Sequence, residues 1–297
     1  MHQFQNNGIL RLLLKLGICK TDSIETYHPK VRDREDIAVM RCTQSGVIFL
    51  SRDDHIDIQT YKEKQDSIYI APAWDRRRVV LHLLADNQRR ANHFQKYICN
   101  KKWLDVGAGM GGVLDMLHNV AIETHAVEPQ ETRKQALISN GYTVYSELEE
   151  VQDSYYQVIS LFHLLEHLDA PINTLRTIRS KIVDGGKIIL EVPHARDILL
   201  TQYDLEAFKD FTFWSEHLIL HTRESLNAFL QEAGFDNINI TGIQRYPLAN
   251  HLYWLAEQKP GGHEEWGHLR STELETAYQQ MLASIDKTDT LIATASK

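Results

Sequence analysis

The chain has 297 residues, which is enough for one large domain or two ordinary ones. It carries 32 Lys and Arg against 40 Asp and Glu, a formal net charge of −8, and this balance disfavours a protein that coats nucleic acid or anionic lipid. With 15 glycines, 7 prolines and 43% hydrophobic residues, the composition excludes the collagen-like and disordered classes.

Residues 1–74 predict a small α+β region. An apolar stretch over residues 8–18, interrupted by Arg11 and Lys15, is too short to span a bilayer. It predicts an amphipathic helix that docks on the body of the protein or on the partner subunit of a homodimer, with a membrane-surface role as the alternative. The chain start lacks the pattern of a signal peptide, and we expect no integral membrane segment.

A β-hairpin is predicted where residues 37–42 and 47–50 flank the turn residues 44–46. The three cysteines are widely spaced and offer neither a disulfide framework nor a metal-binding pair, which is typical of a cytoplasmic protein. They are Cys19, Cys42 and Cys99.

From residue 75 to about 258 the sequence alternates short apolar strands with helices. Strands are predicted at 103–106, 124–128, 142–145, 157–161 and 187–192. Helices are predicted at 74–98, 113–118, 130–139, 171–182 and 222–233. This order predicts an α/β fold, a Rossmann-like, doubly wound, mostly parallel seven-stranded sheet with helices on both faces. In such a sheet the ligand lies beyond the carboxyl ends of the strands.

The remaining segments are harder to place. Residues 194–222 are longer than a crossover needs and predict an insertion over the active face. The last two strands are expected at 237–240 and 252–255. Residues 259–297 are expected to form a helix near 272–285 followed by a polar tail.

The most informative segment is a glycine loop between the first predicted strand of the sheet and the following helix. Gly107, Gly109 and Gly112 satisfy G-x-G-x-x-G, and Glu128 ends the next strand 23 residues after Asp105. Glycines let a backbone approach a ligand closely, and a carboxylate at the second strand accepts both hydroxyls of a ribose. At this point three interpretations of the loop remain open. It binds a nicotinamide dinucleotide, it binds another nucleoside cofactor, or it is a purely structural turn.

Asp105 separates these alternatives. A carboxylate two residues before the first glycine repels a pyrophosphate and attracts a ligand that carries an ammonium and a sulfonium. Here the chain resembles the class I S-adenosylmethionine-dependent methyltransferases, whose first motif ends its strand with an acid followed by G-x-G-x-G. The resemblance covers about residues 75–258 and implies S-adenosylmethionine as the cofactor. The cofactor-binding residues that it implies are Asp105, Gly107, Ala108, Gly109, Glu128, Leu161 and Phe162.

A second motif follows the fourth strand of this sheet, where residues 161–171 resemble the H-x-L-E-H-x-x-x-P signature of small-molecule and glycan methyltransferases. The resemblance implies that His163 borders the transferred methyl group. The alternative is that Glu166 and His167 only fix the loop after the strand.

A third motif lies in the predicted insertion, where Glu216 and His217 match the Y-x-E-H segment of deoxysugar C-methyltransferases. In that group the Tyr, Glu and His reach the substrate, and the His is the general base. The resemblance implies that His217 is the base and that Glu216 orients it. His163 and His194 are the alternative candidates for the base. Trp214 stands in place of the Tyr, and the group's zinc ribbon and large C-terminal domain are missing. A single Cys42 in the hairpin cannot hold zinc, so we expect no metal.

These departures favour a hydroxyl acceptor over a carbon acceptor. We therefore expect a methyltransferase that methylates a hydroxyl of a nucleotide-linked or surface-glycan sugar, with no nucleic-acid partner. The alternatives are a sugar C-methyltransferase, a quinone-type small-molecule O-methyltransferase, and a catalytically silent scaffold that still binds the cofactor.

Overall fold

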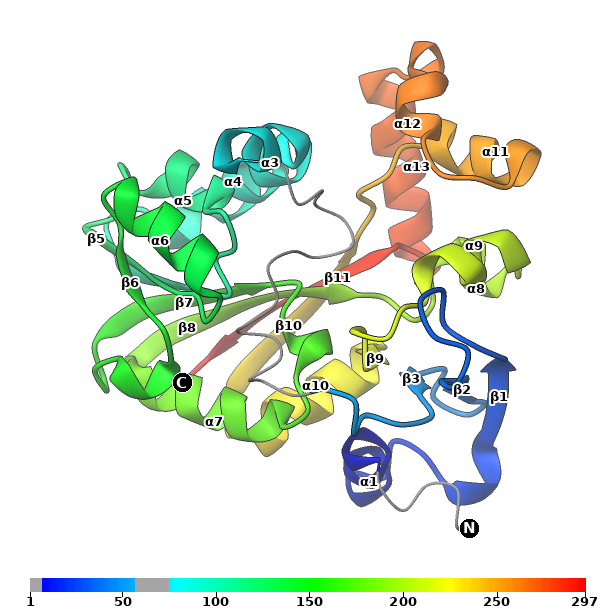
Figure 1. The fold of residues 1–297 in the computed structure, drawn as a ribbon, viewed down its shortest axis with the longest axis horizontal. Coiled ribbons are helices and arrows are strands. Elements are labelled where there is room, and N and C mark those ends of the chain that lie inside the picture. Colours follow the sequence, from blue (N-terminus) through cyan, green and yellow to red (C-terminus); the bar gives the residue numbers. More distant parts are fainter. Residues whose placement is uncertain (1–6, 57–74) are drawn as a thin grey trace.

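The protein is described by a computed structural model that covers residues 7–56 and 75–297. The predicted N-terminal region spans residues 1–74, and its residues 57–74 lie outside the described residues. The element that positions the site is a seven-stranded sheet with the strand order β10-β11-β8-β7-β4-β5-β6 (Figure 1). Its strands are β4 (Lys102–Val106), β5 (Glu123–Val127), β6 (Thr143–Tyr145), β7 (Tyr156–Phe162), β8 (Ile182–Pro193), β10 (Asp236–Ile243) and β11 (Thr290–Ser296).

The sheet is mostly parallel, as predicted. Strands β6, β5, β4, β7 and β8 pair in parallel, whereas β11 pairs antiparallel with both of its neighbours, β8 and β10. Because the first five strands run the same way, their carboxyl ends meet at one edge of the sheet. The glycine loop after β4 and the loop after β7 both leave the sheet at this edge, next to each other.

Helices cover both faces of the sheet, which confirms the doubly wound architecture (Figure 1). One face carries α4 (Leu84–Ile98), α5 (Gly112–Leu117) and α6 (Glu131–Ser139), preceded by the short helix α3 (Arg76–His82). The other face carries α7 (Pro171–Lys181) and α10 (Arg223–Glu232). Thr222 caps α10 as the sequence predicts, since its side chain accepts from the backbone N–H of Ser225 and the two residues form a capping box.

Two expectations about the C-terminal part are wrong. Residues 252–255, predicted as a strand, lie in helix α11 (Leu248–Glu257), where burial falls on Asn250, Tyr253 and Trp254 with helical spacing. The polar tail expected after the last helix is instead β11, which is inserted between β8 and β10 and is almost fully buried. The helix near 272–285 is confirmed as α13 (Thr272–Ser284), and a short helix α12 (Gly262–Glu265) precedes it.

The N-terminal region forms a second sheet together with the predicted insertion. Its order is β1 (Ile24–His28), β2 (Val39–Cys42), β3 (Ile48–Leu50) and β9 (Ile219–Leu220), all paired antiparallel. The hairpin of β2 and β3 is the one predicted, whereas β9 comes from the segment between β8 and α10. That segment, predicted as an insertion at 194–222, also holds α8 (Ile198–Thr201) and α9 (Glu206–Thr212).

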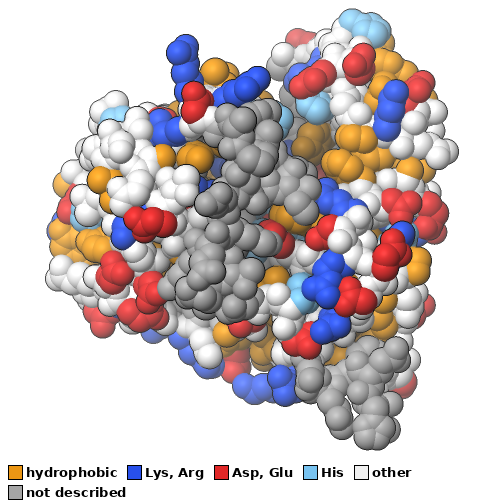
Figure 2. Space-filling view, viewed as in Figure 1, with side chains coloured by type: hydrophobic (Ala, Val, Ile, Leu, Met, Phe, Trp, Pro, Cys, Tyr) orange, Lys and Arg blue, Asp and Glu red, His pale blue; other side chains and the backbone are white. Residues whose placement is uncertain are grey.

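Helix α1 (Gly8–Lys15) is amphipathic, and it buries Ile9, Leu10 and Leu13 in the same core as the small sheet. Among the described residues, every helix is too short or too polar to cross a bilayer. On the face seen in Figure 2, acidic and basic side chains of the described residues are interspersed where they are visible.

Candidate active site

The glycine loop has the backbone that its glycines predict. Gly107 and Gly109 have φ values of +76° and +57°, which a side chain rarely tolerates. A Cβ built on Gly109 meets no atom of the described residues within 4 Å, whereas one on Gly107 comes within 3.1 Å of the Leu164 side chain. The loop after β7 therefore packs directly on the glycine loop, and a ligand has access to the backbone at Gly109.

Asp105 is a buried carboxylate with one described hydrogen bond, which the Ser160 hydroxyl donates at 2.6 Å. The Trp103 indole in turn donates to the Ser160 oxygen at 2.8 Å, so the hydroxyl proton points at Asp105. Burial raises the pKa of Asp105 from 3.8 to about 7, against the hydrogen bond from Ser160 and the charge of Arg90. A cationic group placed here supplies the charge compensation that the carboxylate lacks.

Glu128 follows β5 and is also buried. Its two carboxylate oxygens accept the backbone N–H groups of Gly109 at 2.8 Å and Gln130 at 3.0 Å. Burial raises its pKa, although these two hydrogen bonds oppose the rise. A carboxylate offers about four acceptor positions, so about two remain for the hydroxyls of a ligand.

The other predicted cofactor residues lie at the same edge. Ala108 continues the glycine loop, with its N–H donating to the Val127 carbonyl at 3.3 Å. Leu161 is fully buried in the core, and the Phe162 ring packs 5.2 Å from the Phe94 ring of α4. That Leu161 and Phe162 flank the cofactor stays a prediction.

His163 begins the loop after β7 with a φ of +52°, a conformation that non-glycine residues seldom adopt. Its Nδ1 lies 3.0 Å from Glu166 Oε1, and its Nε2 lies 3.2 Å from Glu191 Oε1. These two carboxylates raise its pKa against the opposing effect of burial. His163 is thus held on both sides by carboxylates of the protein.

Three ligand-type side chains meet beside His163. One nitrogen or oxygen atom from each of Glu166, His167 and His217 lies within 4.8 Å of the others. Glu166 is fully buried and its pKa is lowered to about 2, because the hydrogen bond from His163 and the nearby imidazoles outweigh burial. Burial and the neighbouring His167 hold the pKa of His217 well below 6.5, so its imidazole is neutral.

The N-terminal region fixes the segment that carries His217. The backbone N–H of Leu218 donates to the Glu166 carbonyl at 2.8 Å, and the Leu218 carbonyl accepts from Leu50 at 3.1 Å. Asp33 accepts two hydrogen bonds from Ser215, and His55 contacts the Ser215 carbonyl at 2.6 Å. Sequence reasoning missed these contacts because they join segments far apart in the chain.

The predicted catalytic residues come together only in part. Glu166 is the carboxylate that the described contacts place beside His217. Glu216 is half-buried, and the expectation that it orients His217 stays a prediction. His194 is buried against the Thr288 carbonyl at 2.8 Å, with its pKa lowered to about 4 by burial, which suits a structural role. The cluster of Glu166, His167 and His217 also supplies potential metal ligands, whereas the expectation of no metal depended on the single Cys42.

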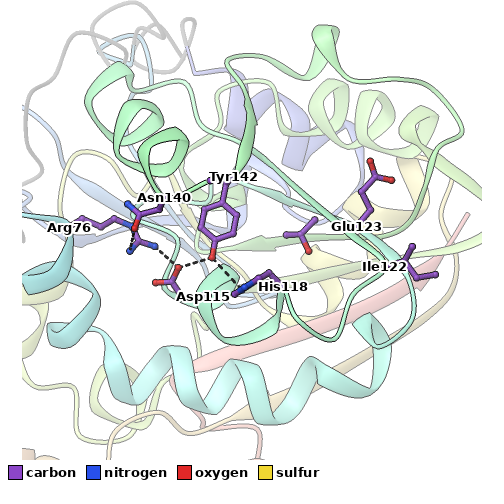
Figure 3. Close-up of a pocket in the computed structure, with 9 residues that line it drawn as sticks. Arg76, Asp115, His118, Ile122, Glu123, Asn140 and Tyr142 are labelled. Carbon is purple, nitrogen blue, oxygen red and sulfur yellow. Dashed lines mark hydrogen bonds and ion pairs between the residues drawn. The ribbon is translucent and has the colours of Figure 1, made fainter.

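A pocket elsewhere on the molecule is separate from this edge. It lies where β5 and β6 begin, between Arg76, Asp115, His118 and Tyr142 (Figure 3). Asp115 accepts hydrogen bonds from both Arg76 and Tyr142, so the polar groups there satisfy one another. The pocket lies at the starts of β5 and β6, and one of its lining residues, Arg76, extends to within 3.4 Å of a Cβ built on Gly111.

Comparison with known proteins settles the family. Residues 75–240 match the family described as "Methyltransferase domain", which is more than half of the chain. The chain belongs to this methyltransferase family. It is an S-adenosylmethionine-dependent enzyme, as the resemblance in its sequence predicts.

This methyltransferase has relatives of both sequence and structure. It is 30% identical over 128 residues to a ubiquinone biosynthesis O-methyltransferase of Haemophilus ducreyi, covering 37% of this chain and 53% of that protein, about half of its length. It is 25% identical to the Acinetobacter baylyi protein of the same name, covering 62% of this chain and 84% of the relative. A methyltransferase structure from Archaeoglobus fulgidus shares the fold, with a TM-score of 0.50 and 19% identity over 75% of this chain and 95% of the other.

The side chains of the methyltransferase site fit S-adenosylmethionine. The Asp105 carboxylate lacks full charge compensation from the protein and therefore suits the cationic methionine part. Glu128 keeps hydrogen-bond acceptor positions for the ribose hydroxyls. The space that the described residues leave above Gly109 lets the ligand approach the backbone.

Proposed function

We propose that this methyltransferase methylates a hydroxyl oxygen of a small-molecule acceptor, with His217 as the general base. The proposal depends on one observation. The loop after β7 packs on the glycine loop through Leu164, and the same loop brings Glu166 within 4.8 Å of His217. A neutral imidazole beside a buried, ionised carboxylate therefore lies close to the cofactor residues.

When bound, S-adenosylmethionine would supply the methyl group, with its carbon–sulfur bond breaking as the carbon–oxygen bond forms and S-adenosylhomocysteine leaving. Asp105 would hold the cationic methionine part, and Glu128 would hold the ribose. His217 takes the hydroxyl proton onto an imidazole nitrogen as the new carbon–oxygen bond forms. Glu166 then stabilises the imidazolium, since its low pKa keeps it ionised. A positioned base of this kind contributes about 10²–10⁴-fold to the rate.

Two acceptor classes are supported by different observations. The names of the two curated relatives support a phenolic hydroxyl of a quinone-type precursor. The resemblance around Glu216 and His217 supports a sugar hydroxyl on a nucleotide or glycan. We favour the quinone-type acceptor, because the relatives align over far more of the chain than the short motif does.

An acceptor screen tests the proposal. Dihydroxyphenyl compounds and nucleotide sugars are incubated with enzyme and S-adenosylmethionine, and mass spectrometry detects methyl ethers. His217→Ala should lower kcat by about 10²-fold or more while the cofactor affinity, measured by calorimetry, stays unchanged. The exposed His268→Ala is the matched control. Full turnover by His217→Ala would remove the base from this role.

A further inference from the structure

The cluster of Glu166, His167 and His217 has unused lone pairs. Glu166 Oε1 is held by His163 at 3.0 Å, but Oε2 is buried and no described residue forms a hydrogen bond with it. The same is true of His167 Nδ1 within the described part of the chain. The described contacts of the His217 imidazole are ring contacts, 4.8 Å from His167 and 5.0 Å from Trp214. Buried polar atoms without partners are rare in folded proteins and call for an explanation.

The types of these three side chains are those of a transition-metal site. Two imidazoles and one carboxylate are a ligand set of zinc sites that keep an open coordination position. They also form the two-histidine, one-carboxylate set of other divalent metals. Ligands at about 2.0–2.2 Å from a tetrahedral ion lie about 3.3–3.6 Å apart. The present spacing, within 4.8 Å, therefore needs a closure of at most about 1.2–1.5 Å.

The surroundings allow this closure. Glu166 is a fixed anchor, because it is fully buried and its carbonyl accepts from Leu218 at 2.8 Å. His167 ends a short 3₁₀ turn, η4 (Leu165–His167), and His217 lies in the loop before β9. Both imidazoles are partly exposed, so they can rotate and an ion can reach them.

We propose that Glu166, His167 and His217 bind a divalent transition-metal ion of the Zn²⁺ class when no acceptor is present, and that the ion inhibits methyl transfer by occupying the nitrogen lone pair of His217. The inhibition rests on the proposed function, in which the same nitrogen accepts the acceptor's proton. The binding does not rest on it, because it needs only the three ligands.

Binding is tested on the full-length protein without any acceptor. Co²⁺ serves as the probe, since its visible absorption reports nitrogen and oxygen ligands in a four- or five-coordinate site, and Zn²⁺ should displace it. His167→Ala should weaken Co²⁺ binding by more than about tenfold. His167→Gln keeps a side chain of similar size but lacks the imidazole, and it should weaken Co²⁺ binding to the same extent. His268→Ala, at an exposed histidine elsewhere, should leave the spectrum unchanged.

Inhibition is tested separately by turnover at increasing Zn²⁺, followed by removal of the ion with a chelator. We expect turnover to fall over the Zn²⁺ range that displaces Co²⁺ and to recover fully with the chelator. A protein that shows no Co²⁺ band, or a band that persists in both His167 variants, overturns the site, whatever the protein methylates. Binding without loss of turnover overturns the inhibitory role and also argues against His217 as the base.

Discussion

The Asp33 carboxylate accepts two hydrogen bonds from Ser215, one from its backbone N–H at 2.9 Å and one from its hydroxyl at 2.6 Å. Ser215 lies two residues before His217, so this contact fixes the start of the segment that carries the proposed base. The N-terminal region therefore contacts the segment that carries the proposed base, although it lies outside the matched family domain.

Asp33→Ala should lower kcat without changing the affinity for S-adenosylmethionine. Each lost hydrogen bond is worth about 0.5–1.5 kcal/mol, so the segment becomes mobile and kcat falls by roughly tenfold. Asp36→Ala is the control, because Asp36 pairs with Arg34 and Arg52 within the N-terminal region. Steady-state kinetics and calorimetry measure the two quantities. An equal loss of cofactor affinity would mean that the change disturbs the whole fold.

Asp105→Asn should weaken cofactor binding by about 10–100-fold, because a charge-assisted contact to the ammonium is lost. The same change should stabilise the empty protein above pH 7. The folded pKa of about 7 exceeds the usual 3.8, so ionising Asp105 costs folding free energy as the pH rises from about 4 to about 7. The gain is at most about 4 kcal/mol.

Thermal unfolding at about pH 8 and about pH 4 checks the stability part, with a higher Tm for Asp105→Asn expected only at the higher pH. Asp184→Asn, at an almost fully exposed carboxylate, is the control for both measurements. Unchanged cofactor affinity in Asp105→Asn would contradict the electrostatic reason for the choice of cofactor.

The affinity for S-adenosylmethionine should fall as the pH drops below about 7. The ammonium of the ligand favours the ionised form of Asp105, so protons compete with the ligand below the pKa of the empty site. The charge of Glu128 raises the pKa of Asp105 and the charge of Arg90 lowers it, and the Ser160 hydroxyl donates a hydrogen bond to the carboxylate. Calorimetry between about pH 8 and pH 5.5 should show up to a tenfold loss per pH unit in the parent protein. The slope should be much smaller in Asp105→Asn.

The placement of the glycine loop, Asp105 and Glu128 at one edge of the sheet could be predicted from the sequence because the signals are local, while their contacts with the cofactor stay a prediction. The glycines, Asp105 and Glu128 lie at the ends of two adjacent strands with short spacing between them, and the chemistry of each residue type restricts the ligand. The acceptor side could not be predicted in the same way. Glu166 and His217 lie together where the Leu218 N–H donates to the Glu166 carbonyl, a contact between distant segments that no local pattern encodes.

The C-terminal errors have a similar cause. The run at 252–255 looks like a strand because four apolar residues follow one another, yet Leu252 and Leu255 are exposed and the buried positions have helical spacing. Strand β11 contains several Thr, Ala and Ser residues and so resembles a polar tail. Its partners β8 and β10 lie far away in the sequence, and only their pairing makes it part of the core.

Leu291→Ala should therefore destabilise the protein strongly. Leu291 lies in β11, is fully buried and pairs with Val192 of β8, and such truncations cost about 2–5 kcal/mol. For a chain of this size the Tm should fall by roughly 4–15 °C. Met281→Ala, on the exposed side of α13, should shift Tm by less than about 1–2 °C. Equal shifts for the two variants would mean that β11 is not part of the folded core.

The small sheet combines two stretches that lie far apart in the sequence. They are residues 24–50 and the two-residue strand β9. Anyone who tries to graft the acceptor preference of a relative onto this enzyme must therefore transplant both stretches as a matched pair. A chimera that exchanges only one of them would mismatch the pairing of β3 with β9 beside the proposed base.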